Sequence, residues 1–519
     1  MTLAGQGPDE TGRKSANITC LLWASREKLT KKYTTKTLFC QEGKAKNMLH
    51  LAKNKQILIF LGVYTLIRVL SFNIINAPHI QTLIAVLIVI TLIYTTLRSP
   101  IHGWYILIGE LLLGGTGHFV ELSIGSLSLA IRTILIYSFI GTFFIKQYTQ
   151  KNIRLPRPLL ITMLIPIIIS IYSALVGLLH GHETTAIIQD LIPYTFFLLI
   201  FPTYLLLKQY AHSKTIKTFF YTFIIGTSIF AIFTFILFAL GIAEPQDPTY
   251  YRWFRDIIAG KVTPIGHNFF RIVEPIHLWL TPIIIYLAAN IIKGSKNKTN
   301  WIFLILLSFP FMMNFSRGYM LGLAAGLLFL LLLKQPKKWL YTSLAIGIMF
   351  FSSFTLMHLT TSKGASPGWD LFGIRISSIV RPETEVSALT RKTLLPPIIE
   401  KIKEHPFIGH GLGASLTFTD PLTNTIVTTR QFDWGYLELL VELGFIGTLL
   451  FMGSILYTIK IMYKKMPYNK ATTVAATLIS ILVITITAPA LFHTIGVLYL
   501  VYIHVTPYVF TKQDKNAIL

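Results

Sequence analysis

Long apolar runs recur along almost the whole chain after its first fifty or so residues. Each run is about 16 to 25 residues long and nearly free of charge, which suits an α-helix that crosses about 30 Å of hydrocarbon. A backbone in a bilayer must satisfy its own hydrogen bonds, so such runs fold as helices or as closed β-barrels. Barrel strands would alternate apolar and polar residues in segments of about ten, and this alternation is missing. The sequence therefore predicts an all-α polytopic integral membrane protein.

Fourteen segments show this pattern, and the third is short enough to be re-entrant, so we expect about 12 to 14 transmembrane helices. The composition agrees, because 53% of the 519 residues are hydrophobic, 13% are charged and the mean hydropathy is +0.61. The expected spans lie near residues 57–72, 80–97, 102–114, 129–146, 158–179, 190–207, 217–241, 276–292, 301–316, 318–334, 339–357, 435–459, 471–487 and 492–510.

The formal net charge of +24 is carried largely by short links between the apolar runs. Such links are typical of cytoplasmic loops, and they predict that both termini are cytoplasmic. The links left on the other side are poor in lysine and arginine, as in "SFNIINAPH" and "HGHETTAIIQD". No basic stripe with interleaved aromatic residues occurs elsewhere, so we expect no nucleic-acid partner. The basic links are 44–55, 146–157, 208–217, 293–298, 334–338 and 460–470.

Residues 1–47 are polar and lack the apolar core and cleavage site of a signal peptide. They have two interpretations, a disordered cytoplasmic extension or an over-long gene start with the true start at Met48. The only two cysteines, Cys20 and Cys40, both lie here. They support neither a disulfide framework nor a cysteine-rich metal site.

Two long segments interrupt the apolar pattern on the side that we predict to be outside. Ordered loops of this length are unusual and are often functional. No internal repeat is visible, which argues against the pseudo-symmetric halves of many transporters. The expected organisation is N-terminal transmembrane helices in 48–241, a first outer segment in 242–275, further helices in 276–357, a large outer segment in 358–434 and C-terminal helices in 435–519.

The two outer segments carry seven arginines. The planar guanidinium of arginine binds phosphate oxygens in a bidentate way. Several arginines that converge at the outer leaflet would suit an anionic lipid-linked substrate such as a polyprenyl pyrophosphate. The alternative is that most of them are solvated loop charges. They are Arg252, Arg255 and Arg271 in the first segment and Arg375, Arg381, Arg391 and Arg430 in the second.

The stretch "SRGYMLGLAAGLL" places Arg317 at the outer end of two short apolar spans. A charge at this depth either anchors the helix at the interface or serves a ligand, and both interpretations stay open. Gly318, Gly322 and Gly326 recur every four residues. This spacing predicts a face of small residues on which a second helix packs closely.

The stretch "EHPFIGHGLGAS", residues 404–415, is rich in turn-forming residues. Its glycines Gly409, Gly411 and Gly413 either let the backbone approach a ligand or simply form a structural turn. It is no phosphate-binding loop of the GK[ST] type. The histidines are scattered, and no HExxH or Asp-x-Asp pair occurs at an outer face. The stretch "HGHE" at 180–183 has two interpretations, a ligand cluster or a solvated short loop, and we favour the loop. We therefore expect no metal and no cofactor.

Three pieces occur in order, "SRGYMLGLAAGLL", "RKTLLPPIIEKIKEHPFIGHGLGAS" and "FDWGYLELLVELGFIGTLLF". Together they resemble the bacterial O-antigen ligase and polymerase superfamily, over about residues 300–460. The resemblance implies an all-helical fold with a large, partly helical periplasmic loop over a cavity, in the bacterial inner membrane. It also implies metal-independent and ATP-independent glycosyl transfer from an undecaprenyl-pyrophosphate-linked glycan to a glycan, lipid A core or protein acceptor.

By position, the resemblance assigns the pyrophosphate-binding arginines to Arg317 and Arg271. Ligases of the family have a histidine just before the helix after the large loop, and here the nearest ionisable residue is Asp433, beside Trp434. Asp433 acts on the substrate, as a base or by orienting a sugar hydroxyl, or else caps the next helix. His405 and His410 are alternative bases. The resemblance thus makes Asp433, Arg317 and Arg271 the candidate catalytic residues.

The candidate substrate-binding set extends this list to Arg255, Arg375, Arg391, His410, Gly411, Gly413 and Glu438. Glu438 and Glu442 lie one helical turn apart near the start of the 435–459 span, where they suit the positive end of the helix dipole and can reach arginines. Glu442 matches the acid of the family's "ExGxxG" motif, which favours a structural role for it.

The leading hypothesis is an O-antigen or exopolysaccharide polymerase that joins lipid-linked repeat units, with membrane lipids and a chain-length regulator as candidate partners. The alternatives are an O-antigen ligase and a protein O-oligosaccharyltransferase, which differ in the acceptor. A transporter of lipid-linked glycans is the hypothesis of a different class. It predicts charges in mid-membrane, whereas Arg68 and Arg132 lie near expected outer ends.

Overall fold

The computed structural model describes residues 55–512 except 114, 116, 125–126, 150–154, 212, 246–248, 267, 382–385, 421–423 and 431. The chain divides after Val63 into two units. Of the first unit only residues 55–63 are described, and they are helical. The expectations for residues 1–47 lie outside the described residues. The second unit, Tyr64–Leu519, holds every feature discussed below.

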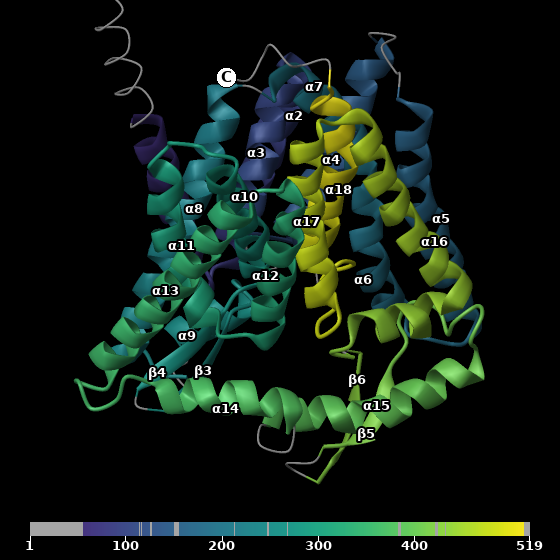
Figure 1. Cartoon of the computed structure of the whole chain (residues 1–519). Coiled ribbons are helices and arrows are strands. Elements are labelled where there is room, and N and C mark those ends of the chain that lie inside the picture. The colour runs from purple at the N-terminus through teal and green to yellow at the C-terminus, as the bar shows by residue number, and fades with distance from the viewer. Residues whose placement is uncertain are drawn as a thin grey trace, which may run out of the picture. The chain divides into compact units, whose positions relative to one another are not determined.

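Helices make up most of the second unit (Figure 1). Each of the fourteen expected spans coincides with a helix, the first with the helix Lys55–Asn73. The others are α2 Pro78–Arg98, α3 Pro100–Leu113, α4 Ile131–Thr149, α5 Arg157–Leu179, α6 Thr184–Thr195 with η1 Phe196–Leu199 and α7 Ile200–Tyr210, α8 Lys214–Ala239, η2 Pro275–Trp279 with α10 Leu280–Ile292, α11 Thr299–Asn314, α12 Arg317–Phe329 with η3 Leu330–Leu333, α13 Pro336–Thr361, α16 Gly435–Lys465, α17 Tyr468–Thr485 and α18 Thr494–Val509.

Nine helices in the described part of the chain are long and apolar enough to cross a membrane, and three shorter apolar helices accompany them. Large apolar side chains such as Leu83, Ile90, Leu344 and Ile348 are exposed along these helices. Exposed apolar surface on this scale needs a lipid environment. The predicted class, an all-α polytopic membrane protein, is confirmed.

Within the second unit, the described parts of the two long segments lie at one end of the helices, and the described lysine-rich links between these helices lie at the other. The link 293–298, for example, joins α10 to α11, whereas α11 meets α12 at the opposite end. We call residues 362–434 the cap segment; its helices α14 and α15 lie across the helix ends (Figure 1). The elements at this end are α9 Tyr250–Asp256, β3 Lys261–Gly266, β4 Phe269–Val273, α14 Trp369–Val380, α15 Val386–Glu404, β5 Leu416–Thr419 and β6 Ile426–Thr429.

Sheet structure in the described residues is limited to three antiparallel hairpins, β1–β2 (Glu121–Ile124 and Leu127–Ala130), β3–β4 and β5–β6. The sequence patterns did not indicate them, because each strand has only four to six residues. The β3–β4 hairpin matters for function, since it pairs Thr263 with Arg271 and so fixes that arginine on a strand.

The glycines of α12 bring this helix against α17. A Cβ atom on Gly322 would lie 2.6 Å from the carbonyl oxygen of Ser480, and one on Gly318 would lie 2.4 Å from Oγ1 of Thr487. Side chains larger than hydrogen would therefore force the two helices apart. The predicted small-residue packing face is confirmed, and its partner is α17.

We expect Gly322→Ala to lower the stability of the folded protein by about 1–3 kcal/mol, because the added methyl group meets the Ser480 carbonyl of α17. The matched control is Gly347→Ala in α13, where an added Cβ has nothing within 4 Å. That control should be neutral or slightly stabilising, since alanine favours a helix over glycine. Thermal unfolding of the detergent-solubilised variants measures both. Equal melting temperatures for the two variants would contradict the packing argument.

Candidate functional site

The turn between α11 and α12 positions Arg317. Helix α11 ends at Asn314, Phe315 adopts a left-handed conformation with φ 44° and ψ 38°, and α12 begins at Arg317. A left-handed non-glycine residue costs about 1–2 kcal/mol. Burial offsets this cost, because the Phe315 ring is 1% exposed and stacks on Phe354 at a centroid distance of 4.9 Å. The turn thus holds Arg317 at the positive end of the α12 dipole.

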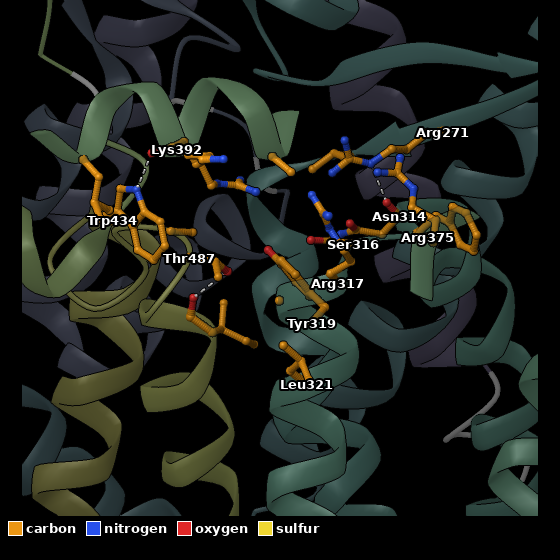
Figure 2. Close-up of a pocket in the computed structure, with 18 residues that line it drawn as sticks. Arg271, Asn314, Ser316, Arg317, Tyr319, Leu321, Arg375, Lys392, Trp434 and Thr487 are labelled. Carbon is orange, nitrogen blue, oxygen red and sulfur yellow. Dashed lines mark hydrogen bonds between the residues drawn. The ribbon is translucent and has the colours of Figure 1, made fainter. Parts of the chain in front are cut away.

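A cavity of about 550 Å³ opens beside this turn (Figure 2). Among the residues that the structure describes, its lining includes five cationic side chains from four elements and no carboxylate. The cations are Arg271 of β4, Arg317 of α12, Arg375 of α14, and Arg391 and Lys392 of α15. The remaining lining residues are Val273, Asn314, Phe315, Ser316, Gly318, Tyr319, Leu321, Ala388, Leu395, Trp434, Ile484, Thr487 and Ala488.

Two of these arginines are fixed by the same turn that carries Arg317. Nε of Arg271 donates a hydrogen bond of 2.8 Å to the backbone carbonyl of Asn314. The guanidinium of Arg375 lies 5.4 Å from the centroid of the Phe315 ring. Figure 2 shows Arg271, Arg375 and Arg317 around Asn314 and Ser316. The turn therefore acts as a common support for three positive charges.

The start of α16 forms another part of the wall. Trp434 lines the cavity, and its indole nitrogen donates a hydrogen bond of 3.0 Å to the backbone carbonyl of Arg391. Nε of Arg391 lies 3.9 Å from Oδ2 of Asp433, whose side chain is 45% exposed. The N-cap position of α16 is Trp434, and no side chain caps the helix. The alternative that Asp433 serves as the N-cap is therefore wrong.

The electrostatics of the cavity define what it can bind. Asp433 offsets part of the charge of Arg391, and a multivalent anion would relieve the repulsion that the gathered cations exert on each other. Arginine donors bind phosphate oxygens in a bidentate way, so the lining has the chemistry to bind a phosphate or diphosphate group. Among the residues that the structure describes, no three His, Cys, Asp or Glu side chains are placed to hold a metal ion.

His410, Gly411 and Gly413 belong to a different structural unit and do not line the cavity. Helix α16 is broken at Gly444, which has φ 66° and ψ −177°. The segment 405–413 fits against this break and supplies the hydrogen-bond partners that the broken helix lacks. The bonds run from the amide of His410 to Val441 O (2.7 Å), from Gly411 to Glu442 O (3.1 Å), from Phe445 to Pro406 O (2.8 Å) and from Ile446 to Phe407 O (3.2 Å).

The "HGHE" loop between α5 and α6 holds the same segment from the other side. Nδ1 of His180 lies 2.8 Å from the carbonyl oxygen of His410, and Nδ1 of His182 lies 2.9 Å from that of Leu412. The rings of His180 and His405 are 4.7 Å apart. Burial lowers the pKa of His410 below its usual value, which favours the neutral ring. The two motifs, distant in sequence, thus form one packing unit.

The remaining predicted residues also lie outside the cavity lining. Glu438 and Glu442 are 5% and 4% exposed on the inner face of α16. The side chain of Arg255 is 59% exposed and bonds to Asp256 at 2.7 Å. Conversely, Lys392, Trp434 and Thr487 line the cavity although the sequence analysis did not select them as binding residues. Of these three, only Trp434 could have been noticed in the sequence, because it is adjacent to Asp433, which stands where ligases of the family have a histidine.

The fold and cavity define a class, a polytopic helical membrane protein with a cationic cavity at the end of its helices that carries the cap segment. Residues 302–452 match the O-antigen ligase family model. This match covers less than a third of the 519 residues and supports membership in the O-antigen ligase and polymerase superfamily. The matched region runs from α11 into α16 and includes all the cationic lining residues except Arg271. No curated protein and no solved structure matches this chain.

Proposed function

We propose that the protein is a glycosyltransferase that polymerises undecaprenyl-pyrophosphate-linked oligosaccharide units at the periplasmic face of the bacterial inner membrane, with both termini cytoplasmic. The observation that supports this proposal is the cavity whose described lining carries five cations, four of them within the region that matches the O-antigen ligase family. The basic links at the opposite end of the helices support the orientation.

In this proposal Arg271, Arg317 and Arg375 bind the pyrophosphate of the donor. The bond between the anomeric carbon and the phosphate oxygen breaks, and the arginines stabilise the charge that develops on the departing pyrophosphate. A new bond forms from the acceptor hydroxyl oxygen to the anomeric carbon. Asp433, next to the cavity-lining Trp434, takes the hydroxyl proton as general base. The reaction as proposed uses neither a metal ion nor ATP.

The other predicted substrate contacts are assigned differently. We assign His410, Gly411 and Gly413 to holding the broken helix α16, because their backbone amides and carbonyls bond to α5, α6 and α16. Glu438 is assigned to the interior of the bundle and Arg255 to the solvated surface. Arg391 and Lys392 complete the anion site from the cap segment. A chain-length regulator stays a candidate partner.

A ligase that passes the glycan to lipid A core or to protein is the second candidate, and the matching family model favours it by its description. Asp433 at the position of the ligase histidine favours the polymerase. Both candidates share the donor and the cationic cavity. A transporter of lipid-linked glycans is the alternative of a different class.

Deletion of the gene tests the proposal through the surface glycans of the host bacterium. We expect long chains to disappear while single repeat units still reach the acceptor, as gel electrophoresis of extracted glycolipids would show. Loss of all glycan from lipid A, with lipid-linked polymer accumulating, would instead identify a ligase. Unchanged glycans in every fraction would contradict both candidates. Plasmid-borne wild-type protein is the control, and it should restore the long chains.

A further inference from the structure

The wall of the cavity formed by Trp434 differs chemically from the arginine-rich turn. Trp434 lies between the cap segment and α16, and part of its indole packs against a small apolar cluster of Leu394, Ile398, Phe432 and Val441. Its single polar atom, Nε1, is already hydrogen-bonded to the carbonyl of Arg391. Because this polar atom is engaged, the rest of the side chain that lines the cavity is apolar ring surface.

The residues near this ring suit a polar ligand with an apolar face. Arg391 and Lys392 of α15 and Thr487, just beyond the end of α17, line the same cavity. Figure 2 shows Trp434 and Lys392 on the side of the cavity opposite Arg271 and Arg375. A pyranose ring has this dual chemistry, since its C–H groups form an apolar face and its hydroxyls accept and donate hydrogen bonds at the edge.

An isoprenoid chain would instead suit another part of the cavity. Leu321, about one helical turn beyond Arg317 in the apolar helix α12, lines the cavity and is 44% exposed. The sequence of surfaces is then apolar at Leu321, cationic at Arg317, and aromatic with polar edges at Trp434. A lipid-linked saccharide has the same order, from hydrocarbon tail through pyrophosphate to sugar.

Resting on the proposed function, we propose that Trp434 is the platform on which the sugar ring next to the pyrophosphate packs with its C–H face. Its indole N–H, bonded to the Arg391 carbonyl, fixes the plane of this platform. The contact between Trp434 and the sugar ring favours a lipid pyrophosphate that carries a sugar over one that does not. It does not contribute to the binding of the pyrophosphate group itself.

Binding to two probes separates these contributions. The probes are undecaprenyl pyrophosphate, which carries no sugar, and the lipid-linked oligosaccharide extracted from the host bacterium, each titrated against the purified full-length protein. In Trp434→Leu we expect affinity for the oligosaccharide probe to fall about five- to tenfold. Affinity for undecaprenyl pyrophosphate should stay within about twofold of wild type, which also shows that the variant is folded.

Trp434→Phe keeps a flat ring but removes the hydrogen bond to Arg391. We expect it to bind the oligosaccharide probe within about threefold of wild type. An equally large loss in the Phe and Leu variants would overturn the platform, since the indole would then matter only for placing Arg391. Unchanged oligosaccharide binding in Trp434→Leu, or an equal loss for both probes, would overturn it too. A wild-type protein that binds neither probe would instead overturn the proposed function.

Discussion

Replacing Arg317 with lysine is expected to lower the rate of glycosyl transfer by about 10²–10³-fold, although the positive charge is kept. Lysine is a compact point charge, whereas the planar guanidinium offers paired donors to two phosphate oxygens. The turn at Phe315 fixes the backbone of residue 317 at the first position of α12. The backbone of residue 317 therefore cannot shift to bring a lysine ammonium to the positions that the guanidinium nitrogens occupy.

The measurement is turnover of extracted lipid-linked oligosaccharide by purified protein, with kcat and KM determined separately. The loss should fall mainly on kcat, because the arginine acts on charge that develops as the bond breaks. Arg255→Lys is the matched control, since Arg255 is exposed and bonded to Asp256 outside the cavity. It should keep the wild-type rate. Full activity of Arg317→Lys, or equal losses in both variants, would refute the pyrophosphate role.

The helical membrane fold could be predicted because a bilayer leaves an apolar run few alternatives. Helices at the predicted spans and the glycine face of α12 follow from local patterns, and the structure shows both. The partner of that face, α17, could not be predicted, since Gly322 and Ser480 are far apart in the sequence. Local periodicity shows that a helix packs closely, and only the three-dimensional arrangement shows against what.

The cavity was only partly predictable for the same reason. Arginine chemistry marked seven loop residues, of which Arg271, Arg375 and Arg391 line the cavity with Arg317. Arg430 instead donates to Gln189 of α6 at 2.7 Å, and Arg255 bonds to its neighbour Asp256. Nothing in the local sequence distinguishes these groups. The distinction arises from the β3–β4 register and from the course of α14 and α15 across the helix ends.

The glycine-rich segment 405–413 was recognised in the sequence, but its role was not, because only its packing decides between the two interpretations. Its glycines were compatible with a ligand loop or with a structural turn. The break of α16 at Gly444 is hidden in the sequence, because the apolar run continues across it without a proline. The segment 405–413 and the break complement each other through backbone hydrogen bonds, which side-chain patterns do not encode.

The largest effect on folding is therefore expected at Gly411. Its φ is +88°, and a Cβ atom there would lie 2.0 Å from the backbone nitrogen of Gly177 and 2.6 Å from the carbonyl oxygen of Ser173. Gly411→Ala adds a left-handed strain of about 1–2 kcal/mol to an overpacking cost of about 1–3 kcal/mol. We expect a loss of about 2–5 kcal/mol in stability, and with it a lower yield of folded protein.

Gly364→Ala is the control that separates the two costs. Gly364 has a similar φ of +84°, but an added Cβ there has nothing within 4 Å. Gly364→Ala should therefore lower the stability only by the conformational strain, about 1–2 kcal/mol. The comparison uses thermal unfolding of the solubilised proteins and the yield of folded protein in the membrane. Equal losses would mean that conformation alone matters and that the close contact with α5 is dispensable.

The packing of Gly411 should also affect the cationic cavity. The segment 405–413 bonds to α16 on both sides of its break, and Trp434 and Asp433 immediately precede the same helix. Any Gly411→Ala protein that still folds should therefore lose transfer activity although no cavity residue has changed. Wild-type activity in a folded Gly411→Ala protein would show that the start of α16 is held by its contacts with α15 and α17 alone.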